Sequence, residues 1–330
     1  MKTESTQPMR IEFKFRPIRP VLTGLGALAG LATMVLFGCG ESGETSQSDD
    51  AAAATTTQQE QPAGEGATSD EGMAVSNRTT TLKKIFHAAP SPMETASLIQ
   101  RSGAKFHGED LNATDKLKDY TTSDRQAISL GVYGADLSYA TIFEENSAAL
   151  EYLRTVKALA ESLGLSNVIS DDVMKRASDN RNDRAALINI VSDTFYDLNE
   201  QLKSNGMEDL AGLVVASGWV EGIYLATRHM SEAPEELKAR IAEQKLTLDD
   251  VLRLCRSYEQ TSALTNMLEA LAPIEAAYDG VTMTQGAAAA NQDAAVIVIG
   301  GGPTFAADDA ALNAIAAAVE KVRNGLVQVQ

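Results

Sequence analysis

Helix start and stop signals recur through residues 79–283, and between them apolar residues fall at helical spacing. The stretch SPME at 91–94 places a capping serine before a proline and an acidic residue, and Gly103 ends that segment. The stretch SDRQ at 123–126 repeats the device and opens a segment that runs to about Phe143. Because the apolar spacing is helical nearly throughout, the sequence predicts an all-α body.

Apolar stripes of the same kind predict the remaining helices. They follow Asn146, Ser170, Pro234 and Thr247, and the last is expected to kink or end at Pro273. The stretch from Leu210 to Ala226 is apolar on nearly all sides, so it is expected to be the central helix. We therefore expect one bundle or array of about seven to nine helices around a single core.

The N-terminal residues 1–38 have the pattern of a signal peptide. Five basic residues precede an apolar run from Val21 to Phe37. The tetrad Leu36-Phe37-Gly38-Cys39 resembles the bacterial lipobox, which implies that Cys39 is acylated and becomes the new N-terminus. A transmembrane anchor with an incidental cysteine is the alternative. The lipobox predicts a lipoprotein of the cell envelope, and Gly40 favours the outer membrane by analogy with Gram-negative sorting.

Residues 39–78 are expected to form an acidic, disordered tether, because residues 40–77 carry eight acidic residues and no basic one. Without residues 1–38 the chain has 23 basic and 43 acidic residues, which is a net charge of −20. Such a charge repels phosphate backbones, so we expect no nucleic-acid partner. The membrane contact is expected to be the lipid anchor alone.

A glycine-rich stretch near the C-terminus, VIVIGGGPTFAA at 296–307, is similar to a dinucleotide-binding turn. Phe305 occupies the position of the third glycine, and only 28 residues follow Gly302, too few for the rest of the fold. We therefore predict no flavin or nicotinamide cofactor. Residues 284–295 are expected to be a low-complexity linker, and 296–330 an extended apolar segment followed by a C-terminal helix that packs on the body.

No catalytic residue or metal site is predicted from spacing. His87, His107 and His229 lie in separate segments without the spacing of a zinc motif. Cys255 lies on an apolar stripe and is expected to be a core thiol; once Cys39 is acylated, it has no cysteine partner for a disulfide.

Polar residues inside the apolar helices are the one candidate site. Ser217, Glu221, Tyr224 and Arg228 follow one helical stripe, and Tyr133 and Asp136 share another. If the two helices face each other, Asp136 and Glu221 approach Arg228. The favoured interpretation is a solvated face or a buried ion pair with Arg228 or another basic residue. The alternative is a ligand pocket, with these candidate residues: Tyr133, Asp136, Trp219, Glu221, Tyr224 and Arg228.

The stretches GVYGADL, GWVEGIYLAT and VEKVRN are similar to those of an uncharacterised family of helical, lipoprotein-type bacterial proteins. That resemblance implies an all-α fold and no particular activity. We expect a lipid-anchored binding or structural interaction module, with an envelope protein or a small molecule as partner. The alternative is a small-ligand-binding protein, or a hydrolase or lyase that uses Asp136 and Glu221 as acid and base. The sequence predicts neither the ligand nor the oligomeric state.

Overall fold

The computed structural model describes residues 92–228, 230, 234–284, 289–290, 299–300 and 303–328. These residues form the helical body and the short strands near its C-terminal end. The predicted signal peptide, Cys39 and the tether lie outside the described residues, as do most of the linker 284–295 and two of the three histidines, His87 and His229.

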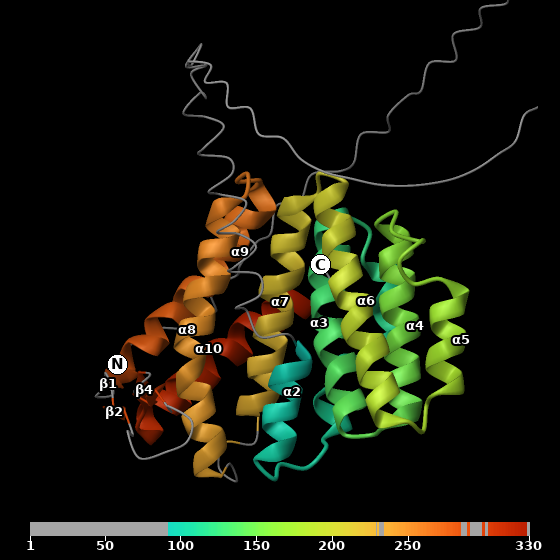
Figure 1. Cartoon of the computed structure of the whole chain (residues 1–330). Helices are drawn as coiled ribbons and strands as arrows, with labels where there is room; N and C mark the ends of the chain where they lie inside the picture. Colours follow the sequence, from blue (N-terminus) through green and yellow to red (C-terminus); the bar gives the residue numbers. More distant parts are fainter. Residues whose placement is uncertain are drawn as a thin grey trace, which may run out of the picture. The chain divides into compact units, whose positions relative to one another are not determined.

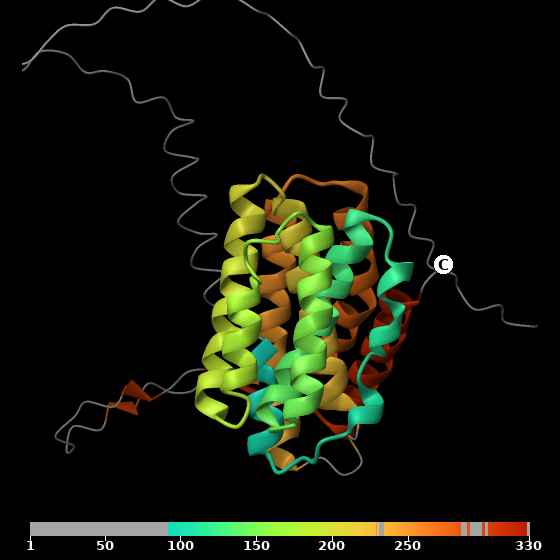
Figure 2. The same ribbon diagram turned by 90° about the vertical axis from the view of Figure 1, so that its right-hand side faces the viewer.

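Helices dominate the body, which confirms the all-α prediction (Figures 1 and 2). They are α2 (Pro92–Arg101), α3 (Ser123–Ile142), α4 (Asn146–Ser162), α5 (Asp171–Asp179), α6 (Arg184–Ser204), α7 (Glu208–Thr227), α8 (Glu235–Ser257), α9 (Ser262–Ala277) and α10 (Asp309–Val327). Short 3₁₀ turns lie at Gly108–Asp110 (η1), Thr114–Asp119 (η2) and Tyr278–Gly280 (η4).

Helices α3 and α7 pack side by side in the middle of the body. Figure 1 shows α4, α5 and α6 on one side of this pair, α8 and α9 on the other, and α10 crossing α7 obliquely. The two central helices approach closely at Gly131 and Gly218: a Cβ added to Gly131 would lie 2.3 Å from the Val214 carbonyl oxygen. Only glycine permits this contact, so the fold depends on a missing side chain at Gly131.

The helix starts follow the expected capping chemistry with small shifts. Side chains of Thr122, Ser170, Asp183, Thr261 and Asp308 each accept a hydrogen bond from a backbone N–H in the first turn of a helix. The cap of α3 is thus Thr122, one residue before the expected Ser123.

The predicted helix boundary at Thr247 is wrong. Helix α8 runs through Thr247, whose side chain is buried, and ends at Ser257. The break comes at residues 258–261, where the Gln260 amide donates to the carbonyls of Cys255 and Tyr258 and Thr261 caps α9. Pro273 lies inside α9 without ending it. Buried residues continue at helical spacing through this stretch, from Ile241 and Gln244 to Leu248 and Val251, so packing against the core overrides the local resemblance to a helix start.

Helix α7 is the central helix, as predicted. It is long and apolar enough to cross a membrane, but 89% of its most apolar window is buried inside the body. Burial on almost all sides is what an apolar helix without a polar face requires.

The chain after α9 forms two small antiparallel strand pairs. Strand β1 (Thr282–Thr284) pairs with β4 (Thr304–Ala306), and β2 (Ala289–Ala290) pairs with β3 (Ile299–Gly300). β4 then leads into α10 and places Phe305 in the core. The extended segment before the last helix is therefore confirmed, and its pairing is antiparallel, unlike the parallel strands of a dinucleotide-binding unit.

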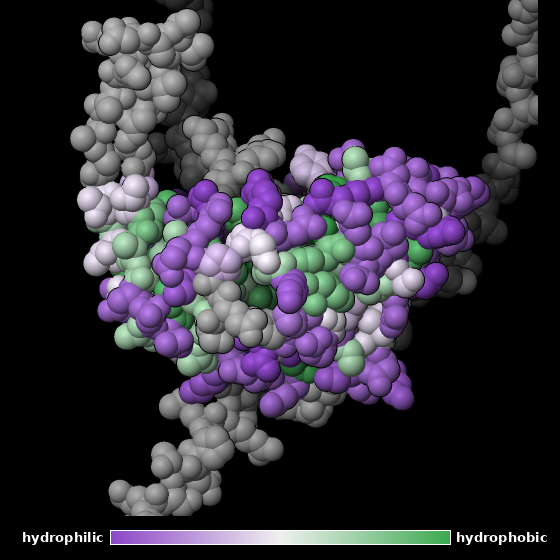
Figure 3. Space-filling view, turned by 90° about the horizontal axis from the view of Figure 1, so that it is seen from below, coloured by the Kyte–Doolittle hydropathy of each residue, from purple (hydrophilic) through white to green (hydrophobic). Residues whose placement is uncertain are grey.

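The surface is polar, with apolar side chains in between. Figure 3 shows the lower face, where hydrophilic residues surround the apolar areas. Among the described residues, the large hydrophobic side chains that are exposed are Tyr196, Leu246 and Met283.

Candidate functional site

Asp136 and Glu221 come together in the middle of the body. Asp136 is on α3 and Glu221 on α7, and both are 0% exposed. Their carboxyl groups lie within hydrogen-bonding reach of each other. The two polar stripes therefore face one another, as the sequence suggested.

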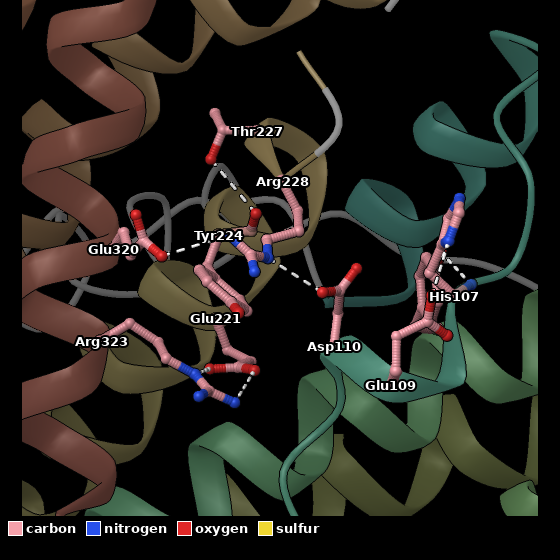
Figure 4. Close-up of polar contacts among 10 residues, drawn as sticks. His107, Glu109, Asp110, Glu221, Tyr224, Thr227, Arg228, Glu320 and Arg323 are labelled. Carbon is pink, nitrogen blue, oxygen red and sulfur yellow. Dashed lines mark hydrogen bonds and ion pairs between the residues drawn. The ribbon is translucent and has the colours of Figure 1, made fainter. Parts of the chain in front are cut away.

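Arg323 of α10 forms an ion pair with one of these two acids, Glu221. Its Nε lies 2.9 Å from one Glu221 oxygen and its Nη2 lies 3.0 Å from the other (Figure 4). The guanidinium also packs over the Tyr224 ring, 4.5 Å from the ring centre. Two parallel hydrogen bonds to Glu221 and a cation–π contact with Tyr224 therefore fix the Arg323 guanidinium in place.

Burial favours the neutral form of the second carboxyl group, that of Asp136. Burial, followed by the charge of Glu221, raises the pKa of Asp136 well above its ordinary value. Burial also raises the pKa of Glu221, although Arg323 opposes that rise. Asp136 Oδ1 has no donor partner among the described residues. The site combines two buried carboxyl groups with one guanidinium, and burial beside Glu221 favours the protonated form of Asp136.

Asp136 also holds the segment between η1 and η2. Its Oδ2 accepts a hydrogen bond of 3.0 Å from the Asn112 backbone N–H. The Tyr152 hydroxyl donates to the Asn112 carbonyl and the Tyr133 hydroxyl donates to the Ala113 carbonyl. Burial raises the pKa of both tyrosines, so they remain neutral donors. Asp136 and Tyr133 therefore anchor the segment between η1 and η2 to the helical core.

Of the two alternatives for the cation, Arg228 or another basic residue, the structure shows the second: Glu221 pairs with Arg323, not with Arg228. Arg228 is 41% exposed and bridges Asp110, at 2.9 Å, and Glu320, at 3.2 Å (Figure 4). It lies at the C-terminal cap of α7, almost two turns beyond Glu221, which is about 10 Å along the axis. This distance carries its side chain past the buried turn to the edge of the body.

The six candidate residues do not line one pocket. Tyr133, Asp136 and Glu221 belong to the buried network, and Tyr224 stacks against its cation. Trp219 points elsewhere: its indole N–H donates to Gln244, and its side chain lines a separate hollow.

That hollow, which we call the α6–α8 pocket, is lined by residues of α2, α3, α6, α7 and α8. Its volume is about 270 Å³. The larger apolar side chains that line it are Met93, Phe195, Val214, Val215, Trp219 and Val251. Among the described residues that line it, none is charged.

Asn199 of α6 is a polar residue on the wall of the α6–α8 pocket. The side chain is 5% exposed, and neither its amide nitrogen nor its amide oxygen has a hydrogen-bond partner among the described residues. Ser138, also on the wall, is paired with the Gly134 carbonyl. A buried carboxamide without hydrogen-bond partners lowers the stability of the folded chain, so Asn199 is an unusual residue for this position.

The described residues contain no group of three or more His, Cys, Asp or Glu side chains placed to hold a metal ion. Cys255 is buried, as expected, and burial raises the pKa of its thiol to about 12. Its sulfur faces the Gly212 carbonyl.

Two residues of these sites were not predicted, although both carry a signal in the sequence. Arg323 lies on the apolar stripe of α10 that includes Val319 and Leu326, where a basic residue is out of place. Asn199 interrupts the apolar face of α6 in the same way, between Phe195 and Leu202. A lone polar residue at a core position marks a buried network or a pocket wall.

In comparisons with known proteins, no family model, no curated protein and no solved structure matches this chain. The resemblance to a helical lipoprotein-type family stays a prediction.

Proposed function

We propose that this chain is a lipid-anchored envelope protein that acts by binding a ligand rather than by catalysis. The observation that supports binding is that the charged residues of the core and the accessible pocket are in different places. The acids Asp136 and Glu221 are fully buried and Glu221 is paired with Arg323, whereas the α6–α8 pocket is lined mainly by apolar side chains and, among the described residues, by no charged one. A general acid or base must reach its substrate, and these two carboxyl groups are enclosed by protein.

The hydrolase or lyase alternative has less support. Burial raises the pKa of both Asp136 and Glu221, as it can in an active site, but each carboxyl group has a structural partner. Perturbed carboxyl groups of this kind also occur in buried ion-pair networks.

The lipid anchor is supported by the sequence of residues 1–39. The test is Cys39→Ser, which should abolish incorporation of labelled lipid and leave the precursor unprocessed. Lipid incorporation into that variant would contradict the anchor.

The binding role is tested by mass spectrometry of small molecules released from the full chain, purified without denaturation. The larger side chain of the Val215→Phe variant should fill the α6–α8 pocket. A small molecule that is released from the native chain but not from this variant supports the proposal. Turnover of an ester or amide substrate that is lost in Asp136→Asn would contradict it and favour the enzyme.

A further inference from the structure

We propose that the α6–α8 pocket binds a small neutral molecule with an apolar body and one amide-like group, and that this group pairs with the Asn199 carboxamide. This inference rests on the binding role proposed above and adds the chemical class of the ligand.

The size of the pocket limits the ligand. A cavity of about 150 Å³ holds benzene, so the volume of about 270 Å³ has room for about ten non-hydrogen atoms. This is close to the lower end of ligand pockets in proteins, roughly 300 Å³. A single ring with a short substituent fits.

The lining selects a neutral and largely apolar molecule. Trp219, Phe195 and Met93 offer aromatic and thioether surface to a ring. A charged ligand would lose its hydration without meeting an opposite charge, because no charged side chain is among the described residues of the lining.

Asn199 specifies the polar group. A carboxamide donates through its nitrogen and accepts through its oxygen, and both atoms are unpaired here. An amide on the ligand offers the complementary acceptor and donor together, which a ketone, an ether or a hydrocarbon does not. Both Asn199 amide atoms are shielded from solvent, so binding is expected to include a turn of the side chain toward the ligand.

The pocket contains an intrinsic fluorophore that can report binding. Trp219 is the one tryptophan in the chain and lines the pocket, so its fluorescence should change when a ligand enters. We would titrate the full chain in detergent with benzamide, with isosteric but anionic benzoate, and with ethylbenzene. A saturable change is expected for benzamide, with a dissociation constant about tenfold lower than for ethylbenzene, because two buried polar atoms gain partners. Benzoate should give no saturable change over the same concentrations.

Three variants assign the effect. Asn199→Leu should abolish the preference for benzamide while the chain remains folded, since an apolar side chain removes the unpaired amide. Asn189→Leu is the matched control, because Asn189 is on the same helix but exposed, and it should bind as the native chain does. Val215→Phe should weaken binding of every probe by filling the pocket.

Two results would overturn the inference, and they differ in what they leave standing. Equal binding of benzamide and ethylbenzene, unchanged in Asn199→Leu, would refute the ligand class and leave pocket binding intact. No saturable change with any probe, together with no molecule released from the native chain, would refute the binding role as well.

Discussion

Replacing Asp136 by Asn should stabilise the protein increasingly as the pH rises. The Asp136 carboxyl accepts from the Asn112 N–H, and burial beside Glu221 raises its pKa, which favours the protonated form. An asparagine can replace this neutral group, because its oxygen accepts from Asn112 and its NH₂ group can donate where the carboxyl proton would. At acidic pH, where Asp136 is neutral in folded and unfolded chains alike, the substitution should change the free energy of unfolding by less than about 1 kcal/mol.

The pH dependence follows from the raised pKa of Asp136. Above the ordinary aspartate pKa, about 3.9, the unfolded chain releases this proton while the folded chain retains it. The folded state then binds more protons, so the stability of the native protein falls by about 1.4 kcal/mol per pH unit from this group, until the folded pKa is reached. The variant has no such group, so its advantage should grow by the same amount per unit.

Urea denaturation of the full chain at a series of pH values from about 4.5 to 8 measures this difference. Subtracting the two curves removes the contributions of groups that behave alike in both proteins. Asp197→Asn, at an exposed position of α6, is the control and should run parallel to the native protein. Parallel curves for Asp136→Asn, or a variant less stable at every pH, would show that Asp136 is ionised or held by other contacts.

Three further perturbations test the packing. Arg323→Met should lower the free energy of unfolding by about 3–5 kcal/mol at neutral pH, because Glu221 loses its cation. This loss should shrink on acidification, because Glu221 then takes up a proton. A cost under about 1 kcal/mol in urea denaturation would mean that Glu221 does not need Arg323. Gly131→Ala should lower the free energy of unfolding by about 2 kcal/mol or more, because the new Cβ would press on the Val214 carbonyl. Gly325→Ala in α10, a position with open space around it, should raise that free energy by about 0.5–1 kcal/mol. Equal effects of the two substitutions in thermal unfolding would contradict the close approach of α3 and α7. Cys255, a buried thiol with its pKa raised to about 12, should react with a disulfide reagent only at the rate at which the body opens, and prompt reaction of the native chain would show it to be accessible.

The helices could be predicted because they depend on local pattern. The sequence left Glu221 on a solvated face or in a buried ion pair, and α7 offers no broad polar face, which is consistent with the burial seen. Caps and stops such as Ser170 and Gly206 mark helix ends within a residue or two. The boundary between α8 and α9 could not be predicted, because the TLDD stretch at 247–250 resembles a helix start although it lies inside a helix whose buried face runs through it.

The partner of Glu221 could not be predicted, because it depends on how distant helices cross. Arg228 is the nearer cation in sequence, but helix geometry carries it away from Glu221, and Arg323 reaches the acid from a helix about 100 residues later. The α6–α8 pocket depends in the same way on the relative placement of five helices. Polar residues on apolar stripes indicate that something is buried, but tertiary geometry decides its partner.

The bidentate contact between Glu221 and Arg323 spans 102 residues, and this has a consequence for the order in which the protein can be completed. A ribosome delivers α3 and α7 first, so the two acids exist before the cation that balances them. Until α10 emerges and docks, Glu221 has to hold a proton or remain in water. A chain that stops short of Arg323 would leave this acid without its cation and is expected to open more often to proteases. An ionised Glu221 therefore has its buried partner only when the sequence through α10 is present and docked.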